Sequence, residues 1–138
     1  MFTSLDVSTS ALVAQRTRLN AISSNIANMS TTRNEYGEPV PYQPRFVTFQ
    51  TDNKLTTPGG GAGVRVGSVE QSNDPPKMKY EPGHPDADAR GFVRYPAVDM
   101  TTEFVDALEA TRAYEANVGV IEITKNMSEQ ALRIIRGK

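Results

Sequence analysis

The chain has 138 residues, the length of one domain, with 15 basic and 16 acidic residues and a formal net charge of −1. This balance excludes a strongly basic nucleic-acid-binding protein, and the absence of cysteine excludes disulfides, thiolate zinc sites and cysteine nucleophiles. No apolar run is long enough to cross a membrane, and the N-terminus lacks the basic and apolar regions of a cleaved secretory signal.

Glycine and proline divide the chain into three segments. All 9 prolines and all but two of the 10 glycines fall within residues 30–98. Because proline breaks helices and glycine weakens them, we predict terminal helices over residues 1–29 and 99–138. The expected fold class is α+β, with long helices packed antiparallel around a small β-rich middle segment at 30–98.

The first segment has an apolar residue at every seventh position, at Leu5, Leu12, Leu19 and Ile26. Ile22 and Met29 form a second apolar column, whose earlier positions are polar. The spacing predicts an amphipathic helix that starts at Thr3 and ends near Met29.

The middle segment has short runs of aromatic and β-branched residues between turn formers. These runs predict strands at residues 42–50, 64–69, 77–80 and 91–95. The glycine-rich residues 59–63 are expected to form a flexible loop between the first two strands.

The last segment begins with Asp99, a good helix N-cap, and carries basic residues in its final turns. Its apolar residues fall on several sides of a helix. A helix that is apolar on several sides must be buried on several sides, and one partner helix covers only one of them. The pattern therefore predicts neighbours from other chains.

Two segments were considered for chemistry, and neither predicts a catalytic, cofactor or metal site. The glycine-rich loop lacks the following helix and the Lys-Ser/Thr pair of a phosphate-binding loop, so a plain turn is favoured. His84, Asp86 and Asp88 resemble part of a calcium loop, but Arg90 stands where a ligand oxygen is required. A rigid turn set by prolines is favoured over a site for an adventitious cation.

Three motifs resemble signatures of the flagellar rod and hook protein family. They are residues 23–28 (SSNIAN), residues 103–117 (EFVDALEATRAYEAN) and residues 80–96 (YEPGHPDADARGFVRYP). The last is similar to the proximal rod branch of the family, and the resemblance covers nearly the whole chain. Residues 29–33 lack the Thr-Pro-Gly-Tyr of most relatives, and Glu115 stands where glutamine is usual.

The resemblance implies a structural protein without enzymatic activity or cofactor. Such proteins leave the cytoplasm through the flagellar type III export apparatus without a cleaved signal, and they polymerise in the periplasm into a hollow, torque-transmitting shaft. Their terminal helices form an inner tube around the export channel. The implied partners are further copies of the chain, other rod proteins, the rod-to-MS-ring junction and the export apparatus, with no nucleic acid and no direct membrane insertion.

Within this reading, both terminal helices supply an assembly interface. Buried asparagines in the helix seam are expected to hold its register. Arg112 is expected to pair with Asp106 or Glu109 on its own helix. The predicted interface residues are Leu5, Leu12, Leu19, Ile22, Asn25, Ile26, Asn28, Tyr114, Asn117, Val118, Ile121, Leu132 and Ile135.

Three alternatives remain open from the sequence. They are a self-contained cytoplasmic coiled-coil adaptor, a small enzyme that uses the turn at His84, and another rod subunit of the same family.

Overall fold

The computed structural model describes residues 2–137 as an α+β fold with two terminal helices and two small antiparallel sheets. The elements are α1 (Phe2–Ala27), β1 (Arg45–Thr56), β2 (Ala62–Gln71), β3 (Lys77–Tyr80), β4 (Phe92–Tyr95) and α2 (Met100–Arg136). Met1 and Lys138, which the predicted terminal segments included, lie outside the described residues.

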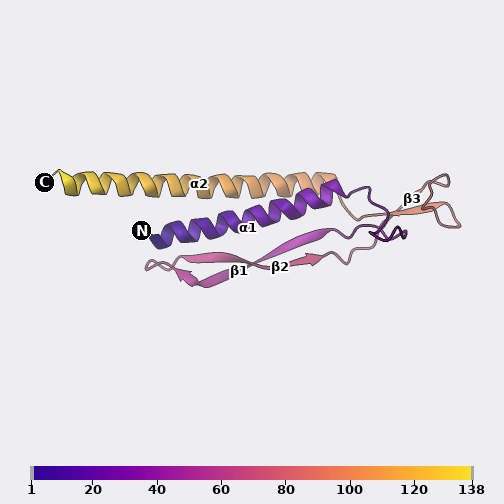
Figure 1. The fold of residues 1–138 in the computed structure, drawn as a ribbon, viewed down its shortest axis with the longest axis horizontal. Helices are drawn as coiled ribbons and strands as arrows, with labels where there is room; N and C mark the ends of the chain where they lie inside the picture. Colours follow the sequence, from indigo (N-terminus) through magenta and orange to yellow (C-terminus); the bar gives the residue numbers. More distant parts are fainter. Residues whose placement is uncertain (1, 138) are drawn as a thin grey trace.

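The helices and the first hairpin form three layers. α1 lies between α2 and the β1–β2 hairpin and contacts both (Figure 1). The two helices run antiparallel, so the N- and C-terminal ends of the chain lie at the end of the molecule away from β3 (Figure 1). The antiparallel arrangement matches the sequence-based prediction.

α1 confirms the N-terminal helix, with small shifts at its ends. It begins at Phe2, so the predicted start at Thr3 is wrong by one residue, and it ends at Ala27, slightly before Met29. The side-chain amide of Asn28 donates a hydrogen bond to the Ser24 carbonyl at 2.9 Å. The same carbonyl also accepts the Asn28 backbone amide at 3.1 Å, so Asn28 binds the last turn of α1 through both its backbone and its side chain.

α2 begins as predicted at the Asp99 N-cap, whose carboxylate accepts a hydrogen bond from the Thr101 amide at 3.0 Å. At a rise of 1.5 Å per residue, its 37 residues span about 56 Å, against about 39 Å for the 26 residues of α1. α2 therefore extends past the N-terminal end of α1 (Figure 1).

The β1–β2 hairpin is longer than its hydrophobic pattern predicts. β1 begins at Arg45, after the buried Pro44, because proline has no amide to donate to a ladder. Pairing then continues through polar residues to Thr56 opposite Ala62. Backbone hydrogen bonds, which hydropathy does not report, extend this strand beyond the predicted range.

The hairpin lies along α1, whereas the β3–β4 hairpin projects beyond the helices (Figure 1). The Val64 amide donates a hydrogen bond to the Ser10 hydroxyl at 3.0 Å, which joins β2 to α1. Gly63 is buried at this contact, where an added Cβ would lie 2.9 Å from the Leu55 Cβ on β1 and 3.2 Å from the Ser10 hydroxyl oxygen. Glycine is favoured because a side chain at this position would collide with the neighbouring strand as well as crowd the helix.

Most buried apolar side chains in the described part of the chain are small. They are Ala14, Ala21, Ile22, Val93, Val98 and Ala110. Large apolar side chains remain exposed instead, most of them on α2. Within residues 2–137, neither helix is long and apolar enough to cross a bilayer.

Candidate assembly interface

The seam between α1 and α2 contains a cluster of charges. Arg18 on α1 lies 3.5 Å from the Asp106 carboxylate and 3.4 Å from the Glu109 carboxylate on α2. The prediction that Arg112 pairs with these carboxylates is wrong, because their side chains face the neighbouring helix rather than the next turn of their own. Since all three groups keep solvent contact, the cluster orients the helices more than it stabilises them.

Asn25 joins three elements near the end of this seam. Its amide nitrogen donates to the Arg45 carbonyl at 2.8 Å and to the Glu103 carboxylate at 3.1 Å. Its oxygen accepts from the Arg45 amide at 2.8 Å and from the Tyr42 hydroxyl at 3.2 Å. Asn25 is buried with all its hydrogen bonds inside one chain, so it holds α1, β1 and α2 together.

Glu103 is the ionisable member of this group. Burial raises the pKa of the Glu103 carboxyl, although the hydrogen bond from Asn25 acts in the opposite direction. The carboxylate also lies in the first turn of α2, where the helix dipole favours negative charge. The junction thus contains a carboxylate whose ionisation costs more than it would in water.

The predicted interface residues on α1 are only partly covered by the chain itself. Ile22 is buried, and Asn28 is half-buried in its turn. The residues of the seven-residue column are all half-buried, namely Leu5, Leu12, Leu19 and Ile26. α1 contacts α2 on one side and the hairpin on another, and this column is not fully enclosed by either.

The predicted interface residues on α2 are more open. Asn117, Val118 and Ile121 are half-buried, and the Asn117 amide donates to the Ala113 carbonyl at 2.8 Å. Tyr114 is 37% exposed, Leu132 54% and Ile135 73%. The prediction that the asparagines are buried holds for Asn25 within one chain, while Asn28 and Asn117 make local hydrogen bonds.

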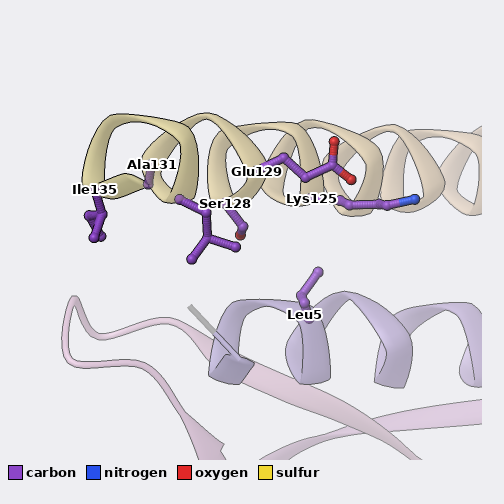
Figure 2. A pocket seen from close by; sticks show the side chains of 7 residues that line it. Leu5, Lys125, Ser128, Glu129, Ala131 and Ile135 are labelled. Atoms are coloured by element: carbon purple, nitrogen blue, oxygen red, sulfur yellow. The ribbon is translucent and has the colours of Figure 1, made fainter. Parts of the chain in front are cut away.

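The two predicted columns approach each other at an apolar groove near the N-terminal end of α1. Leu5, Leu132 and Ile135 line a space of about 490 Å³, with Lys125 and Glu129 at its edge. Leu5 on α1 points towards α2 across this space (Figure 2). Neither helix fills this space. The groove is therefore a place where a further apolar side chain can pack.

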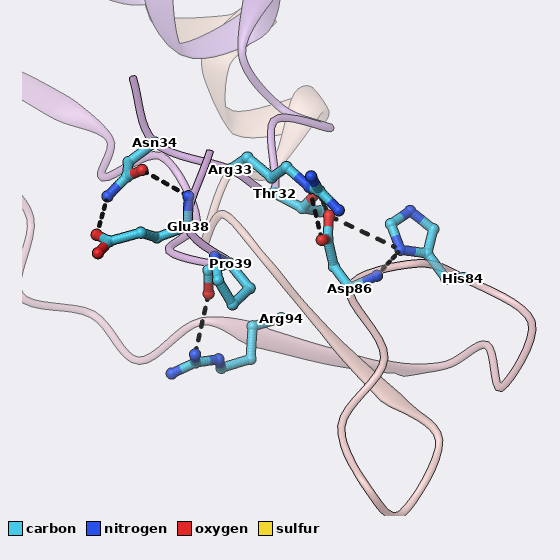
Figure 3. A network of polar contacts seen from close by, with 8 residues as sticks. All are labelled: Thr32, Arg33, Asn34, Glu38, Pro39, His84, Asp86 and Arg94. Atoms are coloured by element: carbon cyan, nitrogen blue, oxygen red, sulfur yellow. Dashed lines mark hydrogen bonds and ion pairs between the residues drawn. The ribbon is translucent and has the colours of Figure 1, made fainter. Parts of the chain in front are cut away.

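The turn at His84 joins two loops through the Asp86 side chain. The Asp86 carboxylate accepts hydrogen bonds from the Thr32 hydroxyl and from Arg33 Nε, each at 2.7 Å (Figure 3). His84 Nδ1 accepts from the Asp86 amide at 3.0 Å. Asp88 points elsewhere and accepts from the Phe92 amide at 2.9 Å. Among the described residues, no group of three metal-ligating side chains is present.

The contacts of Asp86 also determine its charge state. The hydrogen bond from Thr32, together with the Arg33 guanidinium, holds the pKa of the Asp86 carboxyl below its usual value. Sequence reasoning missed this pair and the pairing of Arg18 with α2, because the partners lie 54 and 88 residues apart. The sequence around each of these residues showed only a charged or hydroxyl side chain and did not indicate its partner.

Two sequence families match this chain. Residues 5–33 match the family described as flagella basal body rod protein, and residues 89–134 match the C-terminal family of the flagellar basal body rod FlgEFG proteins. These ranges contain α1 from Leu5 onward, β4 and nearly all of α2, so both helices that form the seam lie within the matched residues.

Similar proteins span almost the full chain. The flagellar basal-body rod protein FlgC of Borreliella burgdorferi is 41% identical over 99% of both chains. The FlgC protein of Bacillus subtilis is 41% identical over 96% of this chain and 97% of its own. The FlgC protein of Salmonella typhimurium is 42% identical over 94% of this chain and 93% of its own.

Proposed function

The chain belongs to the FlgC family of flagellar basal-body rod proteins, and we propose that it builds the proximal rod by polymerising through its terminal helices. It is a structural subunit of the basal-body rod and not an enzyme, which overturns the alternative of a small enzyme built on the turn at His84.

One observation carries the mode of assembly that we propose. Large apolar side chains remain exposed along the whole of α2, from Phe104 at 53% to Ile135 at 73%. Exposed apolar side chains in this number on one helix mark an interaction site rather than a finished exterior. Copies that cover these faces with head-to-tail contacts form an open polymer instead of a closed ring.

The layered arrangement supports one orientation of the subunit relative to the axis of the rod. The hairpin covers one side of α1, so the seam of α1 and α2 is the part left to pack against neighbouring helices. In this proposal the helices form an inner tube around the export channel, and the hairpins lie outside it. The shaft transmits torque because the tube wall is packed helix against helix.

The proposed setting is the periplasm, reached through the flagellar type III export apparatus without a cleaved signal. The proposed partners are further copies of the chain, other rod proteins and the rod-to-MS-ring junction. Family membership and the open helix faces support this setting.

The test is deletion of the gene followed by electron microscopy of isolated basal bodies. We expect rings that lack a shaft and cells that do not swim, with both defects repaired by the wild-type gene on a plasmid. Intact flagella in the deletion strain would contradict the proposal. A shaft that is present but detached from the ring would move the chain away from the proximal position.

A further inference from the structure

We propose that the end of α2 in one copy docks on the first half of α2 in a second copy. This inference rests on the proposed function, and it names the surfaces that meet. The basic tip is residues 130–136, and the acidic half is residues 99–115.

The basic tip continues the face of α2 that contacts α1 past the N-terminal end of α1. Leu132 and Ile135 face the groove beside Leu5, where α1 stops and α2 continues alone (Figures 1 and 2). Leu132 is 54% exposed and Ile134 is 74% exposed. Because an isolated helix draws most of its stability from packing, an apolar overhang of this length needs a partner.

The charges of the tip do not account for these apolar residues. Arg133 and Arg136 suit the negative end of the helix dipole, which a fully polar last turn would serve equally well. Leucine and isoleucine beside them add nothing to that interaction. Their presence among basic residues indicates a surface that buries apolar side chains next to a negatively charged partner.

The acidic half offers such a surface on the same kind of chain. Phe104 is 53% exposed and Leu108 is 60% exposed, and both lie on one face of α2 with the exposed Glu115. Residues 99–115 contain five carboxylates and one arginine, whereas the basic tip at residues 130–136 contains two arginines and no carboxylate. The two surfaces are therefore complementary in charge and alike in apolar content.

The positions of the two surfaces determine the kind of contact they make. The tip lies at the far end of α2 from its first turns, so a straight helix cannot bring the two surfaces together within one chain (Figure 1). We propose that the two copies meet in a head-to-tail arrangement, in which such a contact between different patches is heterologous and builds an open polymer when its rotation does not close. The inference assigns Glu115 the role of receiving Arg133 of the next copy.

The experiment exchanges charges in the full chain, expressed in the bacterium that carries this gene with the native copy deleted. The variants are Arg133→Glu, Glu115→Arg and both together in one chain. Rods are counted by electron microscopy of basal bodies. Lys54→Glu, an exposed reversal on β1, is the matched control, and circular dichroism of each purified variant checks that its helix content is that of the wild type.

We expect each single reversal to reduce the number of shafts several-fold, and the double reversal in one chain to restore most of them. Restoration requires both surfaces to belong to copies of the same chain, because a different rod protein would not carry the compensating charge. Singles that assemble like the wild type, or a double variant no better than the singles, would overturn the inference. A wild-type chain that is absent from the rod would instead overturn the proposed function.

Discussion

Asn25 and Glu103 join the two helices through a hydrogen bond of 3.1 Å between the Asn25 amide and the Glu103 carboxylate. The bond links the last turns of α1 to the first turn of α2, across 78 residues of sequence. The same asparagine holds the first residue of β1 through both its amide and its carbonyl. The buried side chain of Asn25 therefore holds α1, α2 and β1 together at this end of the three layers.

Replacing Asn25 with alanine is expected to destabilise the fold by about 1–3 kcal/mol, because it leaves the partly buried backbone amide and carbonyl of Arg45 without these hydrogen bonds. Urea unfolding followed by circular dichroism on dilute protein measures the loss. Asn117→Ala is the control, since its amide bonds only to a carbonyl of its own helix. Equal losses in both variants would contradict the role given to Asn25.

Glu103→Gln is expected to be more stable relative to the wild type at pH 7 than at pH 4. Burial raises the pKa of Glu103 above its usual 4.5, so the ionised carboxylate costs stability above that raised pKa. The cost falls as the pH drops through the folded-state pKa. Urea midpoints from pH 4 to 7 test this, with Glu115→Gln on the exposed face as control. A difference that does not change with pH would refute it.

Arg18 is expected to contribute little to stability despite its two carboxylate neighbours. The exposed fractions of the side chains are 25% for Arg18, 41% for Asp106 and 67% for Glu109, so solvent screens the attraction. A double-mutant cycle of Arg18→Met with Asp106→Asn should give a coupling energy of about 0–1 kcal/mol. A coupling of several kcal/mol would show that the cluster holds the helices together.

Asp86→Asn is expected to loosen the link between the loop at residues 31–34 and the loop at residues 84–92, leaving the helices unchanged. The pKa of Asp86 lies below the usual 3.8, so its contribution is complete above that value and is lost as the pH falls through the folded-state pKa. Amide hydrogen exchange at neutral pH should therefore accelerate in both loops. Asp52→Asn on the long hairpin is the control, and unchanged exchange in residues 31–34 would contradict the link.

Gly91→Ala is expected to cost about 1–3 kcal/mol in the β3–β4 region, because Gly91 has a φ of +84° and an added Cβ would lie 2.8 Å from the Tyr80 ring. Gly83→Ala is the matched control, because no atom lies within 4 Å of its added Cβ. Hydrogen exchange of Tyr80 and its neighbours in β3 measures the local loss. Similar behaviour of the two variants would show that the turn tolerates a side chain.

Local patterns were sufficient to predict the elements. The seven-residue spacing from Leu5 to Ile26 predicted α1, Asp99 marked the start of α2, and the short run at residues 77–80 predicted β3 to the residue. Strand ends were less certain, because β1 continues through polar residues that pair only when β2 lies beside them. Periodicity predicted the groove residues Leu5, Leu132 and Ile135 as part of an interface. It did not predict which surface covers them, because an apolar column identifies one face of a helix and not the partner of that face.

The sequence by itself determined the two terminal helices, the turn-rich middle and the rod family, because these follow from spacing and motifs over a few turns of chain. Only the tertiary structure decided that the long hairpin lies along α1, that Arg18 rather than Arg112 meets Asp106, and that Asp86 closes onto Thr32. These contacts join residues far apart in the chain, and their formation depends on three-dimensional packing. Periodicity tells which side of a helix is apolar, whereas the covering element is chosen by the geometry of the whole fold.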